Sequence, residues 1–258
     1  MPTKVSVEMV RPEASFLVAG KQQIIDAVTT TRNGGESRGE YAGFNLGDHV
    51  GDNPVHVSNN RSALAEQLGL DDLRWVQQVH GNICHYAGAR VENTSVVADA
   101  LWTDQRNVGL CIMTADCLPI FVADAEARIV AMVHGGWRSL VGGILQKLAG
   151  RIATNKLKLR AWIGPGISFE SYPVGIELRN AIALNFGDEV ASLVCREFNG
   201  ALHADLVTLT MVCLEAAGIE YCGKSAACTY SDTRFFSHRR IVTPLMATGR
   251  IASVIWIK

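Results

Sequence analysis

The sequence lacks the patterns that identify several common classes of protein. Its seven cysteines form no C-x-x-C pair, which argues against both a disulfide framework and a four-cysteine zinc site. No apolar run approaches the roughly 18 residues of a membrane-spanning helix, and the N-terminus shows no cationic segment followed by an apolar one. We therefore expect a cytoplasmic protein with no membrane partner.

The chain also lacks an excess of either charge. Lys and Arg total 24 against 25 Asp and Glu, so the formal net charge is -1. This balance gives no indication of a nucleic-acid partner. An anionic ligand would have to be held by arginines and backbone N–H groups placed locally at its site.

Histidine pairs of the kind that build multicopper clusters are missing as well. The seven histidines include no His-x-His sequence, so a cluster of several coppers within this chain is implausible. A single copper could still bind two histidines and one cysteine, because copper binds such ligands more tightly than zinc does.

The pattern of apolar residues predicts a mixed α/β or α+β fold. With 48% hydrophobic residues the chain can bury a large core, and we predict one domain over residues 1–258 with a central mixed β-sheet flanked by helices. Strands are predicted at 22–30, 73–80, 108–113, 118–124, 128–133, 160–164 and 251–258. Helices are predicted at 54–69, 137–153, 174–186 and 205–217.

Local signals support two of these helices to different degrees. Asn53 is placed to cap the first helix and Pro54 to occupy its first position. Gly142 and Gly143 weaken the second helix. The long Gly-rich connection before the first helix is of a length that is usually functional in a compact domain.

Three residues that can bind a metal stand where predicted strands end. His80 ends the predicted strand at 73–80, and His134 follows the one at 128–133. Cys117 lies in the break between the apolar runs at 108–113 and 118–124. Strand ends commonly carry ligand sites, because a rigid scaffold holds the loops there. One thiolate and two imidazoles suit zinc, and three protein ligands leave a fourth position open. Taken singly, each residue is more typical of a structural role.

The same residues suit a second chemistry. Cys117 could act as a nucleophile with His80 or His134 as its base, and the sequence does not separate this from metal binding. Asp116 could orient a ligand, move a proton or cap a loop. We therefore predict Cys117, His80 and Asp116 as catalytic residues, and His80, Cys117 and His134 as metal ligands.

Polar residues near these positions are candidates for substrate binding. Gln78 shares a strand face with His80, and Arg138 follows "HGGW". The predicted substrate-binding residues are Arg32, Asn45, Gln78, Arg138, His238 and Arg239. Arg32 and the C-terminal arginines are the candidates for holding a phosphate group.

Segments along nearly the whole chain resemble, in order, the motifs of one family. It is named after the bacterial YfiH protein, and also as the multicopper polyphenol oxidase or laccase-domain family and as peptidoglycan editing factor. The segments are "TTRNGGESRGEYAGFNLGDHVGD", "NNRSALAEQLGL", "WVQQVHGN", "ADALWT", "TADCLPIFVAD", "VHGGWRSLVGGIL", "WIGPGIS", "ADL", "CTYSDTRFFSHRR" and "ASVIWI". The resemblance implies a YfiH-like α/β sandwich with a mixed sheet, and it places the family's metal ligands on His80, Cys117 and His134.

The resemblance also implies a set of activities. They are phosphorolysis of purine nucleosides (adenosine, inosine, guanosine and methylthioadenosine), deamination of adenosine, and copper-dependent oxidation of phenols. We expect a zinc-dependent purine nucleoside phosphorylase that takes a nucleoside and phosphate, with adenosine deamination as a second activity. The alternatives are a metal-free Cys/His hydrolase acting on peptidoglycan precursors, a copper-dependent polyphenol oxidase, and a metal-stabilised interaction module with a closed site.

The sequence departs from the family pattern in a few places. It has "HGGWRS" where HAGWRG is common, and Pro173 stands where the family usually has a carboxylate. It also lacks the His-x-Glu and Pro-Cys-x-x-Cys motifs of cytidine-deaminase zinc sites. Deamination by this chain would therefore need a different proton shuttle.

Overall fold

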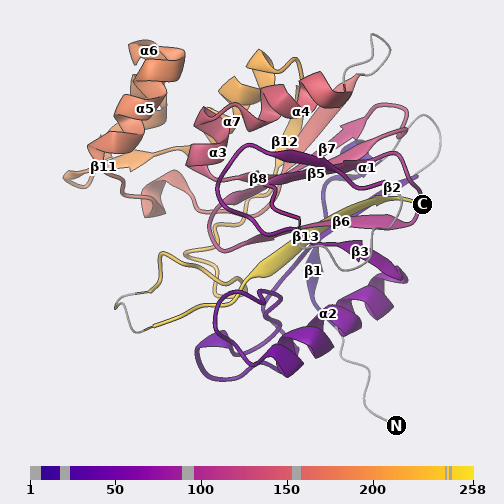
Figure 1. Cartoon of the computed structure of the whole chain (residues 1–258). Helices are drawn as coiled ribbons and strands as arrows, with labels where there is room; N and C mark the ends of the chain where they lie inside the picture. Colours follow the sequence, from indigo (N-terminus) through magenta and orange to yellow (C-terminus); the bar gives the residue numbers. More distant parts are fainter. Residues whose placement is uncertain (1–6, 18–23, 89–95, 153–157, 242, 244–245) are drawn as a thin grey trace.

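Two mixed β-sheets stacked face to face form the centre of the computed structural model (Figure 1). The structure describes residues 7–17, 24–88, 96–152, 158–241, 243 and 246–258. The first two residues of the strand predicted at 22–30, and Ala153 at the end of the helix predicted at 137–153, lie outside these ranges. The mixed α/β class predicted from the sequence is confirmed.

The first sheet has five strands, with β13 at its centre. In spatial order they are β1 (Met9–Val10), β2 (Ile25–Thr30), β13 (Ile251–Ile257), β6 (Val108–Thr114) and β3 (Asp72–Arg74). Neighbouring strands are antiparallel, except that β3 and β6 are parallel. Every residue of β2, β6 and β13 is buried, as expected of strands covered on both faces.

The second sheet has six strands, with β7 and β8 at its centre. In spatial order they are β12 (Glu220–Lys224), β9 (Leu159–Ile163), β7 (Leu118–Asp124), β8 (Val130–Gly135), β5 (Ala100–Thr103) and β4 (Cys84–Tyr86). The pairs β12–β9 and β4–β5 are parallel and the others are antiparallel. The turn at residues 115–117 therefore carries the chain from the first sheet into the second.

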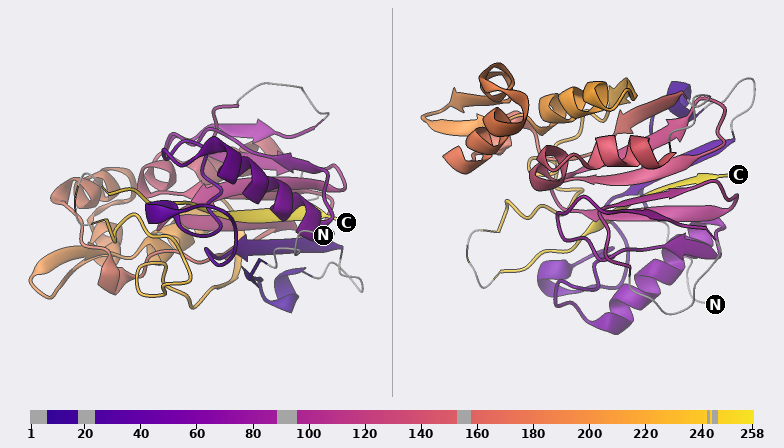
Figure 2. Two further views of the ribbon diagram at one scale, coloured as in Figure 1. Left: turned by 90° about the horizontal axis from the view of Figure 1, so that it is seen from below. Right: turned by 45° about the horizontal axis from the view of Figure 1, so that its top comes forward.

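Helices cover the outer faces of both sheets (Figures 1 and 2). The helices of the described ranges are α1 (Ala14–Leu17), α2 (Pro54–Leu68), α3 (Trp137–Val141), α4 (Ile144–Ile152), α5 (Ile176–Phe186), α6 (Asp188–Val194) and α7 (Leu206–Ala216), with short 3-10 turns at Gly39–Tyr41 and Phe169–Ser171. Helix α2 packs on the first sheet, and α3, α4 and α7 on the second. One apolar cluster, which includes Ile112, Phe121 and Ile255, lies between the sheets. The chain is thus a four-layer α/β/β/α sandwich.

The single central sheet predicted from the sequence is in fact two sheets. Apolar composition shows that β6, β7 and β8 are buried on both faces, but it does not show that β6 and β7 belong to different layers. The predicted strand at 73–80 is also shorter, because β3 ends at Arg74. Beyond Arg74 the segment makes only an isolated bridge, between Gln77 and Val97.

The helix signals in the sequence are confirmed in detail. Asn53 accepts a hydrogen bond from the backbone N–H of Val55 at 2.9 Å and caps α2, and Pro54 opens that helix. The helix predicted at 137–153 is split at Gly142 and Gly143 into α3 and α4. Gly143 has φ +77°, a conformation that glycine adopts without strain.

A smaller lobe projects from one end of the sandwich (Figure 1). It contains α5, α6 and the hairpin of β10 (Cys195–Phe198) and β11 (Ala201–Ala204). Residues 164–175, between β9 and α5, join it to the second sheet. Among the helices of the described ranges, none is long and apolar enough to cross a membrane.

Candidate active site

His80, Cys117 and His134 come together at one end of the two sheets. Their ligand atoms all lie within 4.8 Å of one another, and Cys117 Sγ lies 3.7 Å from His80 Nε2. His80 comes from the segment after β3, Cys117 from the turn that links the two sheets, and His134 from the end of β8. Residues that are 17 to 54 positions apart in the chain thus form one group that could bind a metal.

Asp99 organises two members of this group. It is fully buried, and its Oδ1 accepts a hydrogen bond from His134 Nδ1 at 2.8 Å. The same carboxylate accepts the backbone N–H groups of Val79, His80 and Gly81 at 3.2, 2.9 and 2.7 Å. These bonds hold His80 in its left-handed conformation, φ 57°. Sequence reasoning gave Asp99 no role, although it stands as a lone acid in the quoted segment "ADALWT".

The register of the second sheet explains why Asp99 meets His134. Asp99 directly precedes β5, and Ala100 of β5 pairs with Val133 of β8. The two residues at the ends of these neighbouring strands are therefore adjacent. Because His134 donates its Nδ1–H to Asp99, it presents Nε2 to the other members of the group.

Gly136 leaves room for the three side chains. A Cβ at this position would lie 2.8 Å from His80 Cδ2, 3.5 Å from Cys117 Sγ and 3.6 Å from His134 Cε1. The backbone of Gly136, with φ −72° and ψ 146°, would suit any residue. Glycine is therefore required here for space and not for conformation.

The charges within the group favour a thiolate. Burial opposes ionisation of the Cys117 thiol, but the charge and hydrogen bond of His134, and those of His80, lower its pKa to about 6. Burial likewise opposes the charged form of His134, but the charge of Cys117 and the hydrogen bond to Asp99 raise its pKa to about 9. Without a metal, the two shifts favour a thiolate beside an imidazolium, so a metal ion would bind the thiolate and displace a proton from His134.

The donor set fits a tetrahedral metal ion. Zn–S and Zn–N bonds of about 2.3 and 2.0 Å would place a sulfur and a nitrogen ligand about 3.5 Å apart, close to the 3.7 Å between Cys117 Sγ and His80 Nε2. The carboxylate of Asp99 behind His134 is the supporting contact typical of metal-bound histidines. Cys117 is half-buried and His80 is exposed, so one side of the group faces the cavity.

The three residues lie in a cavity of about 380 Å³, a size typical of small-molecule sites. Of the other predicted site residues, Asp116, Gln78, Arg138, His238 and Arg239 also line it. His49, Trp137, Tyr172 and Arg250 line it too, and sequence reasoning had missed all four. No local pattern marks them as one group, because they come from segments far apart in the chain.

Both carboxylate oxygens of Asp116 accept hydrogen bonds from other parts of the protein. Its Oδ1 accepts the Thr229 hydroxyl at 2.8 Å, and its Oδ2 accepts the Arg239 backbone N–H at 2.7 Å. The residue has φ 100°, outside the regions that non-glycine residues prefer. These two bonds tie the segment that carries Arg239 to the turn that carries Cys117.

Two other predicted substrate residues, Gln78 and Asn45, use their side-chain amides in hydrogen bonds within the protein. Gln78 lines the cavity, but its amide bonds both the N–H and the carbonyl of Met113 at 2.8 Å. Asn45 is fully buried, and its Oδ1 accepts the backbone N–H groups of Gly47 and Arg250. Asn45 does not line the cavity. Its hydrogen bonds hold the loop behind the cavity.

Arg32 also lies outside the cavity. Its guanidinium stacks on the Phe236 ring at 4.6 Å and donates to the Ala42 carbonyl at 2.9 Å. Burial, followed by the charge of Arg240, lowers its pKa. Arg32 therefore holds the Gly-rich loop to the C-terminal segment.

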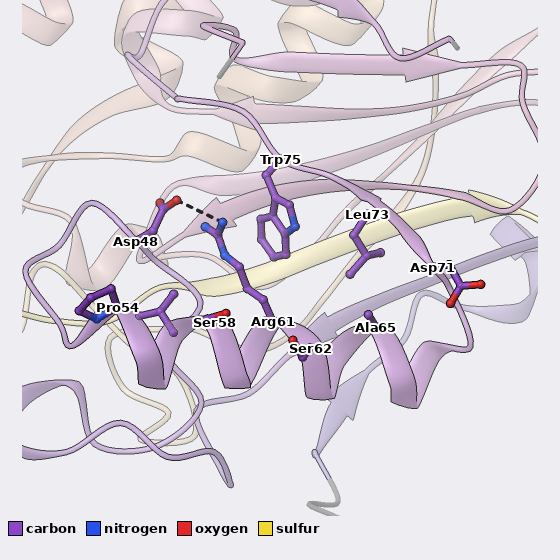
Figure 3. Close-up of a pocket in the computed structure, with 10 residues that line it drawn as sticks. Asp48, Pro54, Ser58, Arg61, Ser62, Ala65, Asp71, Leu73 and Trp75 are labelled. Atoms are coloured by element: carbon purple, nitrogen blue, oxygen red, sulfur yellow. Dashed lines mark ion pairs between the residues drawn. The ribbon is translucent and has the colours of Figure 1, made fainter. Parts of the chain in front are cut away.

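A separate shallow cavity of about 350 Å³ lies between α2 and the strand β3 (Figure 3). Arg61 rises from α2 into it, with its Cζ 4.2 Å from the Trp75 ring centroid and its Nη1 3.1 Å from Asp48 Oδ2. Arg61 Nε also donates to the Leu46 carbonyl at 3.0 Å. Because His49, which follows Asp48, lines the larger cavity, Arg61 supports one of its walls from behind.

The fold and the site define a class of protein, an α/β/β/α sandwich with a His-Cys-His group in a cavity at the end of its sheets. The family model described as "Multi-copper polyphenol oxidoreductase laccase" matches residues 26–258, and the chain belongs to this family. This confirms the resemblance seen in the sequence.

Curated relatives of the chain carry one recurring name. Purine nucleoside phosphorylase PA4543 of Pseudomonas aeruginosa is 36% identical over 236 residues, which are 91% of this chain and 94% of that protein. Purine nucleoside phosphorylase YfiH of Escherichia coli is 36% identical over 236 residues, 90% of this chain and 94% of that protein.

Solved structures share the fold over the whole chain. Protein NMB0706 of Neisseria meningitidis has a TM-score of 0.85 and 32% identity, and the match covers 99% of this chain and 100% of that one. YlmD of Geobacillus stearothermophilus has a TM-score of 0.82 and 30% identity, with 100% of both chains covered.

Proposed function

We propose that this protein is a purine nucleoside phosphorylase that holds one zinc ion at His80, Cys117 and His134. The observation that carries the proposal is the convergence of these three side chains, within 4.8 Å, at a cavity that Arg138, Arg239 and Arg250 also line. Such a cavity combines a metal site with cationic groups that suit phosphate. The names of the relatives support the same reaction.

Zinc would be the resident metal, and copper is the less favoured alternative. Bound to this group, zinc would supply a Lewis acid that polarises a substrate oxygen or lowers the pKa of water. Within the described ranges, His80, Cys117 and His134 form the one such cluster of candidate ligands, so a site for several coppers has no support there.

The chain's own residues would bind and orient the nucleoside. Burial and then the charge of Cys117 raise the pKa of Tyr172 to about 12, so its phenol stays protonated and can donate a hydrogen bond at neutral pH. Burial and then the charge of Arg250 lower the pKa of His238, which favours a neutral ring that can both donate and accept. These groups would hold the base and ribose beside the metal site.

The substrates we propose are adenosine, inosine, guanosine and methylthioadenosine, with deamination of adenosine as a second reaction. The two reactions are distinguished by their products. Phosphorolysis needs phosphate and yields ribose 1-phosphate or its methylthio analogue, whereas deamination of adenosine releases ammonia without phosphate.

Metal analysis combined with an inosine-plus-phosphate assay tests this function. Protein purified without added metal should contain one zinc per chain and form ribose 1-phosphate. Cys117→Ala should lose both, whereas Cys222→Ala, a half-exposed cysteine away from the group, should keep both. Unchanged zinc content and product formation in Cys117→Ala would rule out the proposed site.

A metal-free Cys/His hydrolase is the second candidate, and one observation favours it. The chain Cys117, His134 and Asp99 has the order of nucleophile, base and orienting carboxylate, and the pKa of Cys117 is lowered to about 6. Its substrates would be peptidoglycan precursors. It predicts full activity after chelation and a covalent adduct on Cys117, whereas the zinc site predicts loss of activity.

A further inference from the structure

Two arginines line the cavity on the side of the projecting lobe. Arg138 and Arg239 both border the site cavity and also an adjoining cavity of about 420 Å³, which we call the annex. The annex is lined by Trp137, Arg138, Tyr172, Pro173, Val174, Gly175, Glu177, Leu178 and Arg239. Because four of these residues also line the site cavity, the two spaces adjoin each other.

Aromatic rings orient both guanidinium groups. Arg138 Cζ lies 4.3 Å from the Trp137 ring centroid, and Arg239 Cζ lies 5.0 Å from that of Tyr172. Arg239 is further fixed by a hydrogen bond from Nη1 to the Pro173 carbonyl at 2.8 Å. A guanidinium that stacks on a ring keeps its N–H edge available for an anion.

Neither Arg138 nor Arg239 makes an ion pair within the described part of the chain, whereas Arg61 pairs with Asp48, and Arg234 with Glu8. The annex has one acidic residue in its lining, Glu177. Its carboxylate folds back against Gly175 at the N-terminus of the 11-residue helix α5, where the helix dipole offsets its charge.

Tyr172 connects the arginines with the cavity of the metal group. It lines both cavities, and the Arg239 guanidinium lies 5.0 Å from its ring centroid. A ligand held by the arginines would therefore border the cavity that His80, Cys117 and His134 line.

We propose that inorganic phosphate, the second substrate, binds between Arg138 and Arg239 at the junction of the annex with the site cavity. The inference rests on the proposed phosphorylase function and moves the phosphate away from Arg32, which lines neither cavity. Asp116, through its bond to the Arg239 backbone N–H, is a positioning residue for this subsite.

The placement satisfies the chemistry of phosphorolysis. A phosphate oxygen forms a bond to ribose C1′ while the bond from C1′ to the purine nitrogen breaks. The bonding electron pair leaves on the purine, which takes up the proton that the phosphate gives up. The products are a purine base and ribose 1-phosphate, so atoms and charge balance without a further reactant.

Steady-state kinetics with zinc-loaded protein, inosine and phosphate test the subsite. Arg138→Met and Arg239→Met should each raise the KM for phosphate by about tenfold to a hundredfold, as expected for the loss of a charge-assisted hydrogen bond. The KM for inosine should change by less than about threefold. Arg151→Met, at an exposed arginine of α4 that lines neither cavity, is the matched control and should change neither.

A rise confined to the KM for inosine, or no change in either KM, would overturn the proposal. If wild-type protein forms no ribose 1-phosphate from any purine nucleoside, the phosphorylase function fails, and calorimetric titration with inorganic phosphate decides the subsite. Phosphate binding by the wild type that both Met variants lose supports the subsite. No binding by the wild type rejects it.

Discussion

Asp99 and His134 are joined by two hydrogen bonds, one between side chains and one between backbones. His134 Nδ1 donates to Asp99 Oδ1 at 2.8 Å, and the His134 N–H donates to the Asp99 carbonyl oxygen, also at 2.8 Å. The second bond belongs to the sheet, so the fold itself sets the first. Through the three N–H groups at residues 79–81, the same carboxylate also places His80.

Replacement of Asp99 should therefore weaken metal binding without removing a ligand. In Asp99→Asn, a side-chain amide would replace the carboxylate that accepts these hydrogen bonds, and its NH2 group cannot accept them. The His134 ring would therefore lose its fixed orientation. We expect zinc affinity to fall by about 10- to 100-fold, measured by competition with a chelator. Circular dichroism should show a folded protein, and an affinity equal to that of the wild type would contradict the role given to Asp99.

Gly136→Ala should interfere with the metal group by its volume alone. The added Cβ would lie 2.8 Å from His80 Cδ2, so His80 must move away from Cys117. We expect a lower zinc content after dialysis and a loss of activity of about tenfold or more. Gly150→Ala is the matched control, because its Cβ meets nothing within 4 Å and should stabilise α4 by about 0.5–1 kcal/mol. Equal zinc content in both variants would argue against the steric explanation.

Cysteine reactivity should depend on pH and on the metal. Burial opposes ionisation of Cys228, but hydrogen bonds from Ser168 and Ser231 lower its pKa to about 7. In zinc-loaded protein Cys228 should be alkylated first, at a rate that rises as pH increases through about 7, because the thiolate is the nucleophile. Buried Cys84 and Cys213, whose pKa values burial raises to about 11 and 12, should stay unmodified.

Chelation should then expose a second reactive thiol. With zinc removed, Cys117 should be alkylated even near pH 6, because its pKa is lowered to about 6. Peptide mass spectrometry with iodoacetamide measures both sites. Equal alkylation of Cys117 before and after chelation would mean that its sulfur binds no metal.

Arg61→Met should loosen the loop behind the cavity. The change removes the ion pair with Asp48 and the hydrogen bond to the Leu46 carbonyl. It should lower the free energy of unfolding by about 1 kcal/mol, because the exposed ion pair itself contributes little. Arg61 lowers the pKa of Asp48 against the opposing effect of burial, so the ion-pair part of the loss is full above pH about 4 and disappears only as pH falls through the lowered pKa of Asp48. Thermal unfolding at pH 7 and at about pH 2 tests this, with Arg151→Met as control. A stability loss that is equal at both pH values would assign the effect to packing on Trp75.

The sequence by itself determined the features that depend on near neighbours. Asn53 and Pro54 start α2, Gly142 and Gly143 divide α3 from α4, and apolar composition marks β6 as doubly buried. Each of these signals acts within a few residues, through capping bonds, backbone freedom or side-chain burial. The candidate metal ligands were also readable, because His80, Cys117 and His134 interrupt or end apolar runs.

Only the tertiary structure decided which of these residues meet, and what supports them. Asp99 reaches His134 because β5 and β8 are neighbours, and Asp116 reaches Arg239 across 123 positions of the chain. Arg32 and Arg138 are equally cationic in the sequence, yet one stacks on Phe236 outside the cavity and the other lines it. The pairing of sheets and the course of loops set such contacts, and both depend on burial summed over the whole chain and not on any local pattern.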